Sequence, residues 1–211
     1  MHVEIRIRWV HILFTSKELK VLLVPQGTDA YVLPEDSGQS TNPGKYSTKM
    51  LAPFTASHGH FISQVNNPVL QRDNRGSYMT FDYYILMTPE MTSRSSDSGK
   101  WISVHEALQH KSHISLVISA TIKKLRQDLN HQLVEYYLLP IHFTIPELQR
   151  LYELILGKEL DRANFFRRVL TMDILICSGE RKLNTKSKPP MLYTFNNNYF
   201  KKTEQGATSI F

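Results

Sequence analysis

Two absences limit the classes of protein to which this sequence can belong. It has a single cysteine, Cys177, which excludes an internal disulfide framework. No apolar run approaches the ~18–20 residues that a membrane helix needs. The N-terminus alternates apolar and charged residues, unlike the continuous apolar core of a signal peptide. We therefore expect a cytoplasmic protein that does not enter a membrane.

The positive charge is unevenly distributed along the chain. The formal net charge is +6 at pH 7. Residues 144–202 hold 11 Lys and Arg against 6 Asp and Glu, a net of +5, so most of the excess lies in the last third. Such an asymmetry favours an acidic polymer or an acidic surface as the partner.

Residues 1–135 predict a domain in which strands and helices form a mixed layer. Strands are indicated by apolar residues at alternate positions, loops by turn-forming residues, and helices by apolar residues at helical spacing. The expected elements are strands at the N-terminus, at 21–24 and at 79–86, a long loop at 34–49, and helices at 50–61 and 114–129.

Residues 143–200 predict a second domain that opens with strong helix start signals. Thr144 is a good N-cap, Glu147 completes a capping box, and the helix ends at Gly157. A second helix begins after Asp161, and strands at 174–177 and 191–195 flank an exposed basic loop. Two helices joined by a short turn and followed by a basic hairpin are typical of a winged helix-turn-helix.

The second helix of this domain and the hairpin carry the predicted DNA contacts. Phe165, Phe166, Val169, Leu170 and Met172 are expected to form a broad buried face, while the opposite, polar face enters the ~12 Å major groove. The hairpin cations would contact neighbouring phosphates. A solvated helix face with a basic loop is the alternative interpretation. The predicted contacts are Arg162, Asn164, Arg167, Arg168 and Thr171 on the helix, and Arg181, Lys182, Lys186 and Lys188 on the hairpin.

The run FTIPELQRLYELILGKELDRANFFRRVL, followed by LYTFN, resembles the DNA-binding domain of Nudix-related transcriptional regulators, the NrtR family. Earlier segments are similar to the Nudix-type domain of that family: KVLLVPQG, YVLPED, QRDNRGSYMTFDYYIL, GKWISVHEAL and KSHISLVISATIKKL. The resemblance covers about residues 5–200. It implies an α+β chain with a Nudix-like α/β/α sandwich over 1–135, a linker at 136–142, a winged helix-turn-helix over 143–200 and a polar tail at 201–211.

The same resemblance implies a homodimer that binds double-stranded DNA and senses a small-molecule effector. In this family the effector is ADP-ribose or a related NAD metabolite in many members, and a sugar in others. Four residues lie at matching positions and are candidate effector contacts: Arg72, Asp73, Arg75 and His113. Ordinary loop charges and a locally bonded helix residue are the alternative interpretation of the same four.

Acidic residues are absent from Ser37 to Arg72, where a Nudix hydrolase has its Glu-rich helix. Hard Mg²⁺ ions need several carboxylate oxygens at the diphosphate. We therefore expect no enzymatic activity, no catalytic residue, no metal and no cofactor. Two alternatives stay open: a phosphohydrolase with an atypical metal arrangement, and a winged helix that binds protein, because fold alone does not determine function.

Overall fold

The computed structural model describes residues 3–27, 30–40, 62–74, 76–92, 99–109, 113–183 and 189–196. The helix expected at 50–61 and the tail at 201–211 lie outside these residues. Among the described helices, none combines the length and the apolar content that crossing a membrane requires.

The N-terminal domain is built around one long strand. Strand β1 (Val3–Phe14) pairs in parallel with β7 (Gly76–Met87) along most of its length. On its other side β1 pairs antiparallel with two strands, β4 (Glu35–Ser40) near its start and β2 (Leu19–Gln26) near its end. Shorter strands extend the sheet: β3 (Ala30–Val32) and β8 (Lys100–Ser103) on β2, and β5 (Ile62–Gln64) and β6 (Val69–Asp73) on β7.

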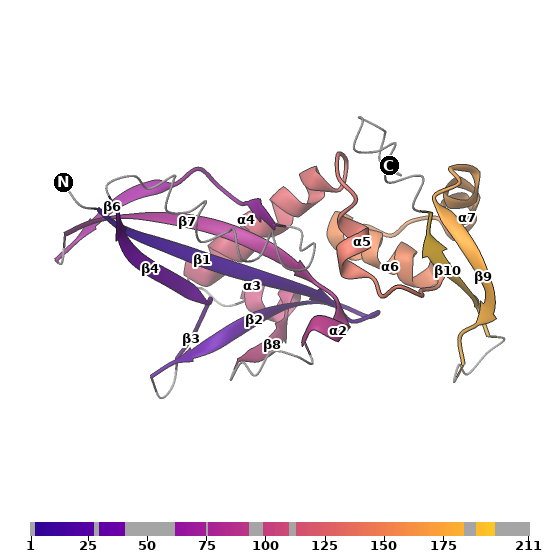
Figure 1. The fold of residues 1–211 in the computed structure, drawn as a ribbon, viewed down its shortest axis with the longest axis horizontal. Coiled ribbons are helices and arrows are strands. Elements are labelled where there is room, and N and C mark those ends of the chain that lie inside the picture. Colours follow the sequence, from indigo (N-terminus) through magenta and orange to yellow (C-terminus); the bar gives the residue numbers. More distant parts are fainter. Residues whose placement is uncertain are drawn as a thin grey trace.

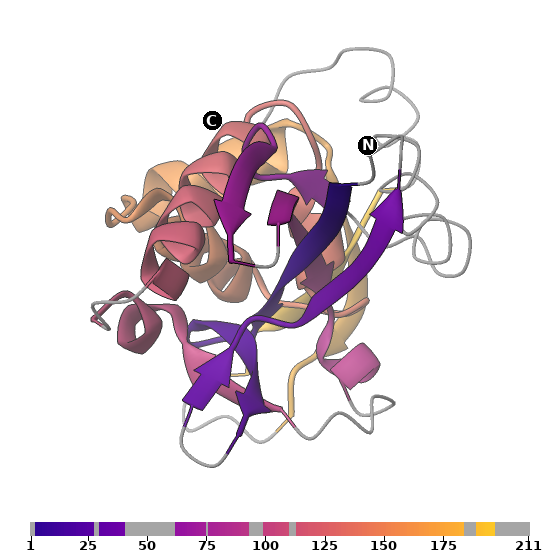
Figure 2. The ribbon, with the colours of Figure 1, turned by 90° about the vertical axis from the view of Figure 1, so that its left-hand side faces the viewer.

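The two faces of this sheet differ. One face of β1 carries Val10 and Ile12, which pack with helix α4 (His113–Asp128) in the main core. Short helices α2 (Pro89–Thr92) and α3 (Val104–Gln109) precede α4. The opposite face carries Ile5, Ile7 and Trp9, which form a second apolar cluster with residues of β7. Figure 2 looks along the sheet and shows α4 on one side of it, with the short helix α2 on the other side.

The strands expected at the N-terminus, at 21–24 and at 79–86 and the helix at 114–129 are confirmed by β1, β2, β7 and α4. The loop expected at 34–49 is wrong for Glu35–Ser40, which form strand β4. These residues pair in register with β1 from Ser40 opposite Val3 to Glu35 opposite Arg8. Ladder hydrogen bonds to a long strand thus override a turn-forming composition, because strand propensity depends strongly on context.

The C-terminal domain lies at the far end of the molecule from β6 (Figure 1). It contains helices α5 (Val134–Leu138), α6 (Ile145–Leu156) and α7 (Arg162–Thr171), followed by the hairpin of β9 (Leu175–Arg181) and β10 (Met191–Phe195). The predicted capping box of α6 is confirmed, and Gly157 ends the helix with a left-handed φ of 70°. This left-handed conformation favours glycine, and a Cβ at Gly157 would also lie 2.9 Å from the end of the Arg126 side chain, which would have to move.

Two expectations about apolar residues in this domain are wrong. Phe165 and Val169 are buried under α7, but Phe166 and Leu170 are 46% and 45% exposed, so the buried face of the helix is narrower than predicted. Cys177 lies in the apolar run at residues 174–177, which predicts a small core residue, but it is exposed on β9. Within the described residues β9 pairs only with β10, so the outer part of this two-stranded hairpin has no layer packed on it.

The two domains share one apolar core. The main cluster runs from β1 and α4 through α5 into α6 and α7 without interruption. Helix α5 overlaps the segment 136–142 that was expected to link the domains, and Leu138 and Leu139 are buried in that cluster. The Arg126 guanidinium also donates to the Ile155 carbonyl of α6. The predicted limits of the two domains, at residues 135 and 143, therefore lie where the two domains pack against each other.

Candidate nucleic-acid interface and sensor site

Helix α7 presents a cationic face to solvent. Asp161 caps its start by accepting a hydrogen bond of 2.8 Å from the Asn164 amide. The five predicted contact residues on this helix are all exposed: Arg162, Asn164, Arg167, Arg168 and Thr171. Because the cap and the two buried residues fix the helix, its outer face is a preformed surface, and its guanidinium groups suit phosphate and guanine edges.

The two described cations of the hairpin, Arg181 and Lys182, have different surroundings. Arg181 donates to the Pro189 carbonyl at 2.7 Å, which ties the two arms of the hairpin together, and its side chain is exposed. Lys182 turns toward the domain and donates to Glu147 at 2.6 Å. Lys186 and Lys188 lie outside the described residues. The sequence had assigned Lys182 to the DNA backbone; here its ammonium group is paired within the protein.

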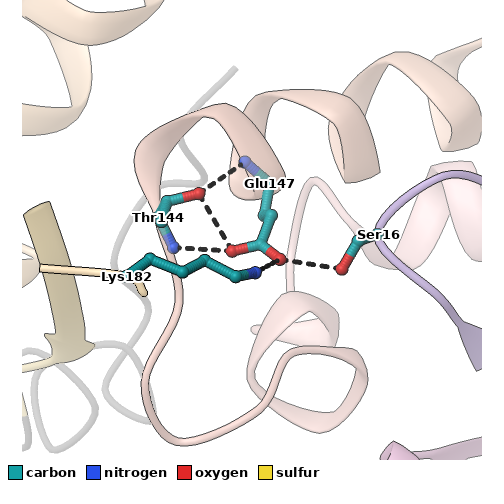
Figure 3. Close-up of polar contacts among 4 residues, drawn as sticks. All are labelled: Ser16, Thr144, Glu147 and Lys182. Atoms are coloured by element: carbon teal, nitrogen blue, oxygen red, sulfur yellow. Dashed lines mark hydrogen bonds and ion pairs between the residues drawn. The ribbon is translucent and has the colours of Figure 1, made fainter. Parts of the chain in front are cut away.

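Glu147 joins three parts of the chain (Figure 3). Its Oε2 accepts from the Thr144 amide at 3.0 Å and from the Thr144 hydroxyl at 2.9 Å, which closes the capping box of α6. Its Oε1 accepts from Lys182 of the hairpin and from the Ser16 hydroxyl at 2.7 Å. Ser16 lies in the turn between β1 and β2, so one carboxylate links the sheet, helix α6 and the hairpin.

Burial alone would raise the pKa of Glu147, but the hydrogen bonds from Lys182, Ser16 and Thr144 more than offset it and lower the pKa. The folded state therefore favours the carboxylate. A depressed folded pKa contributes stability above the unfolded pKa, and this contribution is lost as the pH falls through that range. The hydrogen bonds that Ser16, Thr144 and Lys182 donate to Glu147 thus stabilise its ionised form.

Replacing Thr144 with alanine is expected to lower the free energy of unfolding by about 1–2 kcal/mol, because the helix loses its N-cap. Thr144→Ser keeps the hydroxyl and is the matched control, expected to unfold nearly like the wild type. Urea titration followed by circular dichroism measures both. If both variants lost the same free energy of unfolding, the methyl group of Thr144, and not its hydroxyl, would be what stabilises the N-terminus of α6.

A row of charged side chains lies beside the first half of β1. It is on the same face of the sheet as Val10 and Ile12, which pack with α4. We call it the charged row, and it consists of Glu4, Arg6, Arg8, Glu35, Asp73 and Asp82. Arg8 makes two hydrogen bonds to Asp82, at 2.7 and 3.0 Å. Arg6 donates to Glu4 at 2.7 Å and to Asp73 at 3.3 Å, and its guanidinium lies 3.8 Å from the ring centroid of Tyr78.

Two of the four predicted effector contacts reach this row. Asp73 accepts from Arg6, and His113, at the start of α4, contacts Arg8 through Nε2. Arg72 is exposed on β6, and Arg75 lies outside the described residues. The structure therefore brings Asp73 and His113 to neighbouring arginines on one face. Sequence reasoning missed Arg6 and Arg8, although their alternation with Ile5 and Ile7 already marked a strand face rich in charge.

The pKa values in the charged row follow from its pairing. The hydrogen bond to Glu4 is the largest cause that raises the pKa of Arg6 above its ordinary value. Burial raises the pKa of the Glu35 carboxyl, and the positive charges of Arg6 and Arg8 offset this rise only in part. Half-buried, paired charges of both signs offer donors and acceptors to a polar ligand. Among the described residues, no cluster of His, Cys, Asp and Glu could hold a metal ion.

A comparison with known structures identifies the fold of the chain. A crystal structure of a MutT/nudix family protein from Enterococcus faecalis, 17% identical, matches 92% of this chain and 88% of its own with a TM-score of 0.55, which shows the fold alone. The chain is thus an α+β protein with a Nudix-like sandwich and a C-terminal winged helix-turn-helix, as expected.

The particular relatives are NrtR proteins. Residues 135–195 match the family model of the NrtR DNA-binding winged helix domain. A crystal structure of Shewanella oneidensis NrtR complexed with a 27mer DNA is 27% identical, covers 91% of this chain and 93% of its own, and gives a TM-score of 0.68. Among curated proteins, the ADPR responsive transcriptional repressor NtrR of Acinetobacter baylyi is 28% identical over 131 residues.

That match spans 59% of this chain and 52% of the Acinetobacter protein, so the chain covers about half the length of the curated relative. The family model covers the C-terminal domain, and the Shewanella structure covers both domains. Together these comparisons confirm the resemblance found in the sequence: the chain is NrtR-like.

Proposed function

We propose that this protein is a sequence-specific DNA-binding transcriptional regulator whose Nudix-like domain senses a small metabolite and does not hydrolyse it. The exposed cationic face of α7, held by its cap beside a basic hairpin, is the observation that carries the proposal. The proposed partners are double-stranded DNA, a small-molecule effector and a second copy of the chain, and the proposed place of action is the cytoplasm.

Charge and geometry support DNA as the partner. The net charge of +5 over residues 144–202 is concentrated in the domain that carries α7. A homodimer would present two copies of α7 to successive major grooves, which requires a palindromic site with half-sites ~10–11 bp, or a multiple of that, apart. Selection of bound fragments from a random DNA pool at near-physiological salt tests this. An enriched palindrome supports the proposal, and no enrichment, with or without effector, contradicts it.

Arg167→Ala is expected to weaken binding to the selected site by about 1–3 kcal/mol and to relax the preference at one base pair, because a guanidinium contact to a base edge is lost. The same is expected of Arg168→Ala if Arg168 also contacts a base. Lys158→Ala removes one charge from the exposed turn before α7 and is the control. Affinities from fluorescence anisotropy measure the effect. Wild-type binding in both arginine variants would contradict the assignment of this face.

The charged row is the proposed effector site, with Asp73 and His113 as contacts, and Arg72 and Arg75 remain the other two proposed contacts. Two candidate classes follow from the resemblance: ADP-ribose or another NAD-related metabolite, whose phosphates would compete for the paired arginines, and a sugar, whose hydroxyls would bond to both charges. Calorimetric titration with ADP-ribose and with pentoses distinguishes them. Loss of binding in Arg8→Ala would place the ligand at the row, and unchanged binding would place it elsewhere.

The proposed lack of hydrolase activity rests on the absence of acidic residues from Ser37 to Arg72. Incubation with ADP-ribose and Mg²⁺ or Mn²⁺ tests it directly. Turnover that depends on the metal would revive the alternative of a phosphohydrolase, since carboxylates from other parts of the chain would then have to bind the ion.

A further inference from the structure

The exposed face of α7 carries apolar side chains that the DNA-binding proposal has not used. Ala163, Phe166, Arg167 and Leu170 are spaced i, i+3, i+4 and i+7, so they share one side of the helix. They line a shallow groove of about 770 Å³ that runs along α7. Phe166 and Leu170 are each exposed by nearly half, in a helix whose core-facing positions are already filled by Phe165 and Val169.

The residues around Phe166 and Leu170 indicate which kind of partner binds this face of α7. Arg162, Arg167 and Thr171 line the same groove, so apolar atoms and cations lie side by side. Asp161 lines its end, where its carboxylate accepts from the Asn164 amide as the cap of α7. A second protein surface would have to desolvate or pair those guanidinium groups, which is costly. The major groove of DNA instead presents phosphates and guanine edges to arginine, and it presents the C5 methyl group of thymine to apolar side chains. An apolar and cationic helix face matches that combination.

Resting on the proposed function, we propose that Phe166 and Leu170 read thymine through its C5 methyl group, on the side of Arg167. Each half-site then contains at least one thymine next to the base pair that Arg167 contacts. This contact is specific, because in the major groove of normal DNA the methyl group belongs to thymine alone. The predicted polar face thereby becomes the cationic half of a wider reading surface.

Deoxyuridine provides a test that changes one methyl group and leaves base pairing intact. In the site selected from the random pool, each thymine is replaced in turn by deoxyuridine, and affinities are measured for the full-length protein. Burial of one methyl group contributes ~0.8 kcal/mol, which corresponds to about a fourfold change in affinity. We expect a three- to fivefold loss at one or two thymines of each half-site.

The same substitutions in variants identify the side chain responsible. In Phe166→Ala or Leu170→Ala, the affected thymine should lose its preference over deoxyuridine, so that the two DNAs bind equally. Leu116→Ala is the control, because Leu116 is an exposed leucine on α4, far from α7 in the sequence. Circular dichroism checks that each variant is folded, and sedimentation measures its oligomeric state.

Each outcome has one meaning. Loss of thymine preference in the Phe166 or Leu170 variant, with preference retained in Leu116→Ala, supports the inference. Equal binding of thymine and deoxyuridine by the wild type at every position overturns it and leaves the DNA-binding function standing. A Phe166→Ala variant that keeps the preference but dissociates into monomers assigns the patch to self-association and also overturns it. A failure to select any DNA sequence removes the proposed function and this inference together.

Discussion

Phe165→Ala is expected to lower the free energy of unfolding by about 3–5 kcal/mol, among the largest losses that a single side chain of this protein can cause. Phe165 is 1% exposed and fixes α7 on the domain. Its ring packs at an angle of 64° against Tyr152 of α6, with 5.7 Å between the centroids. Alanine would remove this contact and leave a cavity that the two helices cannot fill completely.

The adjacent residue provides the matched control for this prediction. Phe166→Ala removes the same atoms from a side chain that is 46% exposed, and we expect a change within ~0.5 kcal/mol. Urea denaturation at neutral pH measures both variants. Similar losses for Phe165→Ala and Phe166→Ala would mean that α7 is rotated relative to the structure, and the outward position of Arg167 would then also be wrong.

Glu135→Gln is expected to gain stability relative to the wild type by about 2–3 kcal/mol between pH 5 and pH 8. Glu135 is buried in α5 at the junction of the domains, and burial raises the pKa of its carboxyl to about 7. The hydroxyl of Tyr152 donates to its Oε1 at 3.1 Å, which opposes this shift only in part. Among the described residues, Oε2 has no hydrogen-bond partner.

The sign of this effect follows from proton binding. Between the ordinary pKa of a glutamate and about 7, the folded state holds a proton on Glu135 that the unfolded state has released. The free energy of unfolding of the wild type therefore falls as the pH rises through this window, and it levels off above it. Glutamine does not ionise, so this dependence disappears in the variant.

Urea titrations of the wild type and of Glu135→Gln at pH 5, 6, 7 and 8 measure the difference. Glu159→Gln, at an exposed position in the turn before α7, controls for the loss of a negative charge. Parallel pH profiles for the wild type and Glu135→Gln would show that the Glu135 carboxyl is hydrated and ionised in the folded protein.

Local signals in the sequence identified most elements of the C-terminal domain. The capping box of Thr144 and Glu147 and the cap at Asp161 are short-range patterns with a direct physical cause, and both helices begin where these residues place them. The alternation in β1 and β7 was equally clear, because each strand has a fully apolar stretch on one face.

Features that depend on tertiary pairing were not predictable from the sequence. Glu35–Ser40 reads as a loop and becomes a strand because β1 supplies a partner. Phe166 and Leu170 read as core because hydrophobicity does not reveal how much of a helix its neighbours cover. Arg6 and Arg8 contact Asp73 and His113 only because β6 and α4 bring these residues to them from far along the chain.

The common core of the two domains affects how such a protein can evolve. Val134 and Leu138 of α5 pack in one cluster with residues of both β1 and α6. A gene fusion that moved the winged helix onto another N-terminal domain would expose the apolar residues on both sides of this junction. The C-terminal domain is therefore not separable at this junction: a recombination that transfers it would also have to transfer the surface of the N-terminal domain on which α5 packs.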